Sequence, residues 1–181
     1  LILFIYFFVG VFLSINTGIS HDEFHEQQNW LFNLEAIRNF LTTGQYDTFL
    51  NYKDKYHGIG FHFFSQPIQF IFSKLLQNIF NISQYGGVLL SKHLAVFLIF
   101  FISSLYLSSI FKILNNDQYF VAISLLIYLF FPYFFGHSLF NPKDIPFLSI
   151  WVICTFYIIK ILQNHKLGKD IQIKLILFIS F

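Results

Sequence analysis

The chain has 181 residues, of which 56% are hydrophobic and 11% are charged, and its formal net charge is +2. Soluble domains carry about 25% charged residues, and the mean hydropathy here is +0.62, so the composition argues against a soluble domain and predicts a membrane protein. The single cysteine, Cys154, excludes a disulfide within the chain.

Apolar runs without charged residues predict membrane-spanning helices, because crossing a bilayer takes roughly 20 predominantly apolar residues. With their flanking residues, the spans are expected at about 1–15, 91–111, 119–136, 145–162 and 171–181. The first and last runs are shorter than a full span and the sequence contains no Met, so we expect a chain truncated at both ends. The predicted fold class is all-α, a polytopic transmembrane helical bundle formed by one domain over residues 1–181.

The long segment 16–90 is predicted to be a loop that carries two helices on the membrane surface. Apolar residues recur at helical spacing within 24–43, and Gly44 follows where a helix end is expected. Residues 61–82 mix Phe and Leu with polar residues in an amphipathic pattern, which suits a helix lying in the interface. Their length alone would also allow them to cross the membrane.

The distribution of charge decides between these two interpretations of residues 61–82. Segment 160–174 carries Lys160, Lys166, Lys169 and Lys174 against one acid, which the positive-inside rule assigns to the cytoplasm. Counting spans backwards then places 136–144, and the residues just before 92, on the outer side. The acid-rich loop 16–60 suits the same side only if 61–82 does not cross, so we predict an interfacial helix and polar chemistry gathered on one membrane face.

The first polar cluster is the run His21-Asp22-Glu23-Phe24-His25-Glu26 at the outer end of the first span. A carboxylate pair there could act as a general base or bind a divalent cation; the alternative is a solvated helix start, where acids complement the helix dipole. The spacing of His21 and His25 also suggests a zinc protease, but HDEFH lacks the HExxH order of that class.

Two further clusters are predicted on the same side. Residues 136–147 (GHSLFNPKDIPF) join two apolar spans and hold His137, Lys143 and Asp144, with Pro142 and Pro146 expected to keep the connection non-helical; the alternative is an ordinary turn with an interfacial ion pair. Ser91-Lys92-His93 precedes the next apolar run, where a cation could meet a lipid phosphate or simply anchor the helix in the interface.

In this order, the features resemble the GT-C class of membrane glycosyltransferases, specifically the family-39-like group that includes protein O-mannosyltransferases and lipid A aminoarabinose transferases. The resemblance covers essentially the whole chain as the N-terminal catalytic module. It implies catalytic roles for Asp22, Glu23 and Asp144, with Asp22 as the base that accepts the acceptor hydroxyl proton. Lys92 stands where the family usually has Arg, and donor-phosphate contacts are expected from Lys92, His93, His137 and Lys143.

The implied reaction is an inverting displacement that moves a sugar from a polyprenyl- or dolichyl-phosphate donor to a hydroxyl of a glycan, lipid or protein acceptor. The resemblance implies no particular cofactor, since members of the family differ in metal dependence, and a divalent cation held by His21, Asp22 or Glu23 is compatible with it. The partners expected are this donor, the acceptor and membrane lipids, with no nucleic acid. The expected location is the inner membrane of a bacterial cell, as a multi-pass protein with its active site on the extracytoplasmic face.

The main alternative is a transporter or flippase of lipid-linked sugars, which would not be an enzyme. That class is expected to carry ionisable residues near the middle of its spans. The internal apolar runs of this chain carry none, and the polar clusters lie at their outer ends, so the sequence favours the transferase.

Overall fold

The computed structural model describes residues 1–45, 47–55 and 58–163. All regular structure in these ranges is helical, which confirms the all-α prediction for them. The helices are α1 (Ile2–Asn16), α2 (His21–Thr43), α3 (Asp47–Leu50), α4 (Gly60–Phe80), α5 (Gln84–Leu114), α6 (Gln118–Phe130), α7 (Pro132–Ser138) and α8 (Asp144–Gln163).

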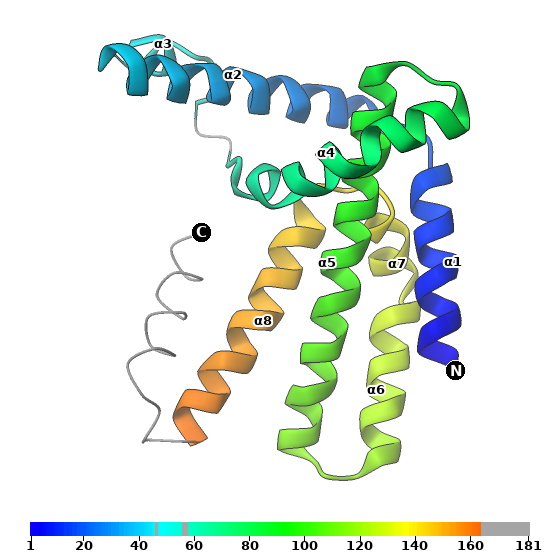
Figure 1. The fold of residues 1–181 in the computed structure, drawn as a ribbon. Helices are drawn as coiled ribbons and strands as arrows, with labels where there is room; N and C mark the ends of the chain where they lie inside the picture. Colours follow the sequence, from blue (N-terminus) through cyan, green and yellow to red (C-terminus); the bar gives the residue numbers. More distant parts are fainter. Residues whose placement is uncertain (46, 56–57, 164–181) are drawn as a thin grey trace.

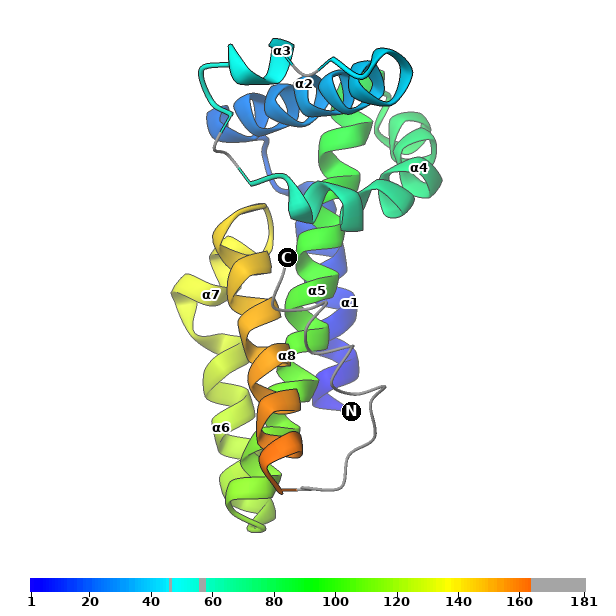
Figure 2. The ribbon, with the colours of Figure 1, turned by 90° about the vertical axis from the view of Figure 1, so that its left-hand side faces the viewer.

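The helices form an upright group covered at one end by two crosswise helices (Figure 1). Helices α1, α5, α6 and α8 run roughly along one direction, and α2 and α4 lie across the end at which α5 begins; the turned view in Figure 2 shows the same arrangement. Helix α5 is central, since it packs against α1, α4, α6, α7 and α8. Its buried residues Val96, Phe97 and Phe100 join Tyr6 and Leu129 in the apolar core.

Two of the described helices are long and apolar enough to cross a membrane, namely α5 and residues 144–161 of α8. Two bent pairs raise this number to as many as four: α1 with α2, bent by 84°, and α6 with α7, bent by 58°. The expected spans at 91–111 and 145–162 thus fall within α5 and α8. The expected span at 171–181 lies outside the described residues.

The run 119–136 is not one continuous helix, because it breaks between Phe130 and Pro132. Proline lacks an N–H and its ring clashes with the preceding turn, and the residue before it is pushed out of the helical region; Phe131 accordingly has φ −61° and ψ 118°. The connection to α8 also differs from expectation, since Pro146 lies inside α8 rather than before it. A proline is tolerated in the first turn, where its N–H would have no intrahelical partner.

Both crosswise helices bury a group of polar side chains and expose several large apolar ones. The buried face of α2 includes Glu23, Glu26, Gln27, Asn29 and Asn33, and the exposed residues of the same helix include Phe24, Leu31, Phe40 and Leu41. In α4, His62, Ser65 and Gln69 are buried, whereas Phe63, Phe70, Ile71 and Ile79 are exposed. Exposed apolar side chains beside buried polar ones are unusual in a soluble protein and suit helices that contact lipid.

Helices α4 and α5 cross closely at Gly87. A Cβ atom at this position would lie 2.5 Å from the backbone carbonyl oxygen of Ser73 in α4. Because backbone can yield only by moving a helix, we expect Gly87→Ala to destabilise the protein by about 1–3 kcal/mol. Thermal unfolding of the purified protein in detergent measures this change.

The matched control is Gly136→Ala, which also places Ala inside a helix but meets no atom within 4 Å. Since Ala favours a helix over Gly by up to about 1 kcal/mol, the control should be neutral or stabilising. Equal effects of the two substitutions would argue against the close crossing of α4 and α5.

Candidate functional site

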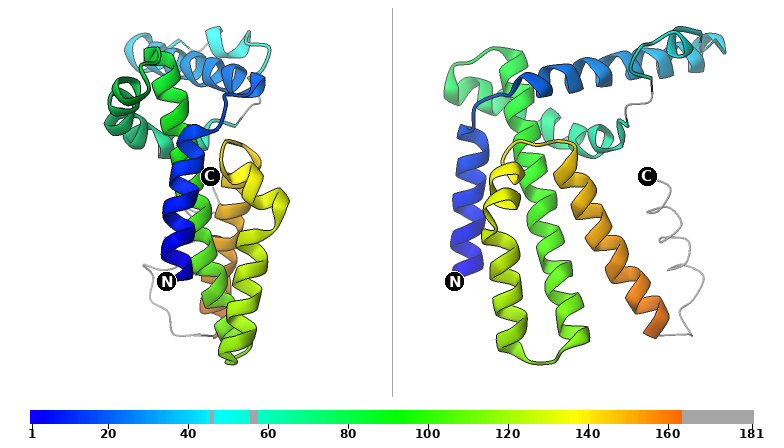
Figure 3. Two further views of the ribbon diagram at one scale, coloured as in Figure 1. Left: turned by 90° about the vertical axis from the view of Figure 1, so that its right-hand side faces the viewer. Right: turned by 180° about the vertical axis from the view of Figure 1, so that it is seen from behind.

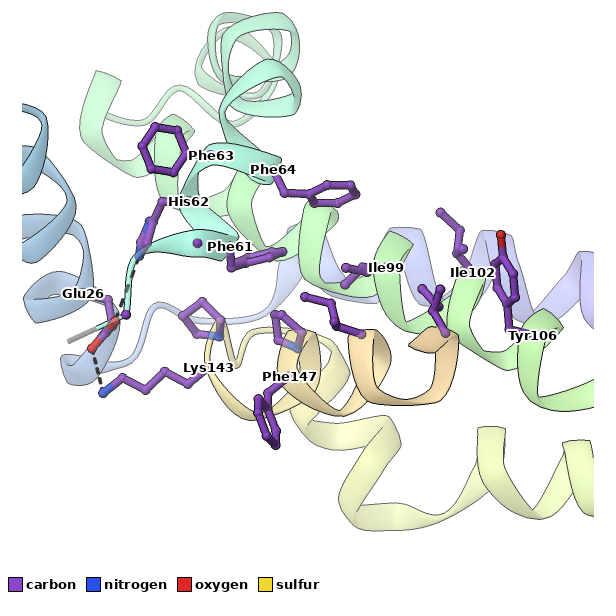
Figure 4. A pocket seen from close by; sticks show the side chains of 16 residues that line it. Glu26, Phe61, His62, Phe63, Phe64, Ile99, Ile102, Tyr106, Lys143 and Phe147 are labelled. Carbon is purple, nitrogen blue, oxygen red and sulfur yellow. Dashed lines mark ion pairs between the residues drawn. The ribbon is translucent and has the colours of Figure 1, made fainter. Parts of the chain in front are cut away.

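The buried polar face of α2 meets α4, α5 and the α7–α8 connection at the crosswise end of the fold. At the centre of this contact is Glu26, whose side chain is only 4% exposed and whose Oε1 lies 2.7 Å from Nζ of Lys143. Its other oxygen, Oε2, lies 4.0 Å from Nε2 of His62, too far for a hydrogen bond. Figure 4 shows the three side chains converging from α2, α4 and the connection before α8.

These three side chains form the polar end of a cavity of about 910 Å³. The other walls are almost entirely apolar and come from α4, α5 and α8, including Phe61, Ile99, Ile102, Pro146 and Ile150. On α5 the lining runs from Ile99 to Tyr106, which corresponds to about 10 Å along a helix. The cavity therefore joins a charged group at the crosswise end to an apolar channel beside the upright helices (Figure 4).

His62 is buried at the polar end of the cavity. Its ring stacks on Trp30, with centroids 5.5 Å apart and planes within 9°, and the side chain is 3% exposed. Burial lowers the pKa of His62 below its ordinary value of 6.5, and nearby Lys92 lowers it further, although Glu26 acts in the opposite direction. Among the described residues, Nδ1 of His62 has no hydrogen-bond partner, so a bound molecule could supply one.

The lowered pKa of His62 gives an expected dependence of stability on pH. At pH values between the lowered pKa and about 6.5, His62 binds a proton in the unfolded chain but not in the folded protein. The free energy of unfolding is therefore unaffected by His62 above about pH 6.5 and falls as the pH decreases through this window. The loss is at most about 1.4 kcal/mol per pH unit. Unfolding measured at several pH values should show a smaller acid loss in His62→Gln than in the unmodified protein.

The exposed histidine His21 provides the matched control for this measurement. His21→Gln should keep the acid dependence of the unmodified protein. An unchanged acid dependence in His62→Gln would contradict the assignment of the effect to His62.

A second polar group lies beneath the first and involves the start of α5. His93 and Lys92 are both fully buried, as is Glu23 of α2. Nε2 of His93 contacts Oε2 of Glu23, and its Nδ1 lies 3.1 Å from the carbonyl oxygen of Ser14 at the end of α1. Nζ of Lys92 donates to Oε1 of Gln27. These contacts join α1, α2 and α5 through side chains that no solvent reaches.

Asn141 organises the connection that presents Lys143. Its Oδ1 accepts the backbone N–H groups of Lys143 and Asp144, each at 3.0 Å. Its Nδ2 donates to Oδ2 of Asp144 at 2.9 Å and lies 2.9 Å from Nδ1 of His137. His137 and Asp144 therefore fold the connection on itself, and Lys143 is the member of this run that reaches α2.

The structure brings the three predicted clusters to one end of the fold but distributes their residues differently from expectation. Asp22 and His21 are exposed, and neither lines the cavity. Glu23, Lys92 and His93 are fully buried and do not line the cavity, so a donor phosphate could touch them only in a different arrangement of α2. Asp144 and His137 do not line the cavity either, which leaves Lys143 as the expected site residue that does.

The metal site considered at His21, Asp22 and Glu23 is not assembled, because the first two side chains are exposed and the third is buried against His93. In the described part of the chain, no group of three or more His, Cys, Asp and Glu side chains is placed to hold a metal ion.

Sequence reasoning missed Glu26 and His62 as site residues. Both had been noticed only as members of polar runs, because a soluble protein turns such residues to solvent. The predicted position of both helices on the membrane surface could have found them. A helix in that position turns its apolar face to the lipid and its polar face to the rest of the protein. There, the polar residues at 23, 26, 27 and 33 of α2, and those at 62, 65 and 69 of α4, would be on the faces turned inward.

The described part of the chain has only helices as regular structure, and two of them, or up to four spans if each bent pair counts as one, are long and apolar enough to cross a membrane. These helices suggest a membrane protein. Comparison with known protein families, with curated proteins and with solved structures finds no match to this chain. The resemblance to GT-C glycosyltransferases therefore stays a prediction.

Proposed function

We propose that the protein is a membrane glycosyltransferase that moves a sugar from a polyprenyl-phosphate carrier to an acceptor hydroxyl at the extracytoplasmic face. The observation that carries the proposal is the cavity of about 910 Å³, which is charged at one end and apolar along α5 and α8. A lipid-linked sugar phosphate has the same division into a polar head and a hydrocarbon tail. Small-molecule sites combine apolar walls with a few placed polar groups in this way.

The polar end supplies the two groups that such a transfer needs. Glu26 is the general base that removes the proton of the acceptor hydroxyl, and the freed oxygen attacks the anomeric carbon. The bond from this carbon to the phosphate oxygen breaks, and its electron pair leaves with the polyprenyl phosphate. Lys143 stabilises the departing phosphate anion. Lys143 is well suited because its side chain is 45% exposed beside the nearly buried Glu26.

The assignment of the base to Glu26 differs from the role that the resemblance implies for Asp22. Glu26 lines the cavity, whereas Asp22 lies one turn earlier on α2 with an exposed side chain. A base must come within hydrogen-bond reach of the proton it removes. Glu26 therefore suits an acceptor bound at the cavity end, and Asp22 suits one bound outside it.

Binding of a short polyprenyl phosphate to the purified protein in lipid nanodiscs tests the proposal without knowledge of the sugar. The two comparison probes are the polyprenol of the same length and inorganic phosphate. We expect saturable binding of the polyprenyl phosphate at least tenfold tighter than that of either probe, because a charged hydrogen bond contributes about 1.5–3 kcal/mol.

Equal binding of the polyprenol and its phosphate would contradict a phosphate site at Lys143. Saturable binding of inorganic phosphate alone, with no added affinity from the lipid, would contradict the role of the apolar walls. Ile102→Trp, which narrows the apolar part and leaves the polar end unchanged, should weaken binding of the polyprenyl phosphate.

A further inference from the structure

Glu23 and His93 lie outside the cavity and have no part in the proposed reaction. Their hydrogen bonds determine where protons lie on the His93 ring. Both side chains are fully buried. Each acceptor around the imidazole is identified: the carbonyl oxygen of Ser14 on the Nδ1 side and Oε2 of Glu23 on the Nε2 side. A carbonyl has no proton to give, so Nδ1 must carry a hydrogen to satisfy that contact.

The second contact then requires one more proton. If Nε2 and the Glu23 carboxylate both lacked it, a nitrogen lone pair would face an anionic oxygen in a place that water does not reach. One proton shared between the two groups removes this conflict. The pair as a whole is then electrically neutral, either as imidazolium with carboxylate or as imidazole with carboxylic acid.

Two hydrogen bonds favour the ionic arrangement. The backbone N–H of Ser20 donates to Oε1 of Glu23 at 2.8 Å, and a donor of this kind favours an ionised carboxylate. The carbonyl of Ser14 accepts from Nδ1 and favours a positively charged ring. Lys92, the residue before His93 on α5, is also fully buried and donates to Gln27 rather than to Glu23. His93 is therefore the basic side chain in hydrogen-bond contact with the carboxylate.

We infer that His93 is a buried imidazolium, that Glu23 is its counter-ion, and that this pair positions α2 against the ends of α1 and α5. Glu23 is then a positioning residue and not a catalytic one. The pair matters for the site because Glu26 follows Glu23 by three residues on the same helix, so the contact that fixes the first turn of α2 also sets where Glu26 meets Lys143.

Three variants test the inference by stability alone, which keeps the result independent of any transferase activity. His93→Gln leaves the buried Glu23 carboxylate without the cation that contacts it, and we expect the unfolding equilibrium constant to rise by roughly 100-fold or more. Glu23→Gln can keep the hydrogen bonds with a neutral imidazole, so its effect should stay within about tenfold. The double variant E23Q/H93Q removes both charges and should recover at least about tenfold of the loss seen in H93Q.

If Glu23 acted only by filling space, the destabilisation caused by E23Q would add to that caused by H93Q, and the double variant would recover none of the loss. Equal damage from E23Q and H93Q, with no recovery in the double variant, would overturn the inference.

A spectroscopic measurement covers the case in which H93Q yields no folded protein. In histidine labelled with nitrogen-15, the signals of His93 should show both ring nitrogens protonated near neutral pH. In E23Q, one of the two should shift to the value of an unprotonated ring nitrogen. An unprotonated nitrogen in the unmodified protein would overturn the imidazolium assignment.

Discussion

Replacing Glu26 by Gln is expected to lower the rate of sugar transfer by about 10²–10⁴-fold, the usual contribution of a general base. Gln has the same shape and can still contact Lys143 and His62, but it cannot accept a proton at neutral pH. The loss should therefore appear in kcat, with the affinity for a polyprenyl phosphate largely kept. Transfer in reconstituted vesicles and binding in nanodiscs measure the two quantities separately.

Asp22→Asn is the matched comparison, since it changes a carboxylate one turn away on the same helix. Because Asp22 is exposed and does not line the cavity, we expect its rate to stay within about tenfold of the unmodified protein, well short of the loss of a general base. The opposite result, with transfer abolished in D22N and kept in E26Q, would return the role of base to the residue that the family resemblance implies.

Replacing Lys143 by Met is expected to weaken binding of a polyprenyl phosphate by about 10–100-fold, because a hydrogen bond to a charged group contributes about 1.5–3 kcal/mol. The apolar part of the cavity is unchanged, so binding of the corresponding polyprenol should not weaken. The substitution also leaves Glu26 buried without the cation that lies 2.7 Å from it, and some loss of stability should accompany it.

Two controls separate charge from other effects. Lys143→Arg keeps a cation and should retain most of the phosphate affinity. Lys160→Met removes a lysine near the far end of α8, where Nζ lies 5.2 Å from the ring centre of Phe156, and should leave binding unchanged. Equal loss of phosphate affinity in Lys143→Met and Lys160→Met, with affinity kept in Lys143→Arg, would mean that net charge, and not the position of Lys143, governs binding.

Much of the helical order could be predicted from the sequence, because it depends on local signals. Helix α2 was expected within 24–43 with Gly44 after it, and the helix ends at Gly44 with φ 73°. Residues 61–82 were expected to form an amphipathic helix in the membrane interface; the helix is present as α4, and it lies crosswise at the same end as α2 (Figure 3). The chemistry of turns and the length of apolar runs determine these features within a few residues.

The contacts of the candidate site could not be predicted, because they depend on which face of each helix turns inward. From spacing alone, Asp22 and Glu23 are equivalent neighbours, yet a rotation of about 100° per residue along the helix separates a buried side chain from an exposed one. Lys92 and His93 illustrate the same limit, since both were expected to reach a ligand and both are covered by α2. Only the packing of α2 on α5 decides these positions.

The central claim is that the cavity between α4, α5 and α8 holds the tail of a polyprenyl phosphate while its head lies at Glu26 and Lys143. Photochemical labelling with a polyprenyl phosphate that carries a reactive group in its tail tests it directly. The account predicts label on cavity residues such as Ile102 and Ile150, displaced by an excess of unlabelled polyprenyl phosphate. Label confined to outward-facing residues such as Trp151, and not displaced by that competitor, would contradict it.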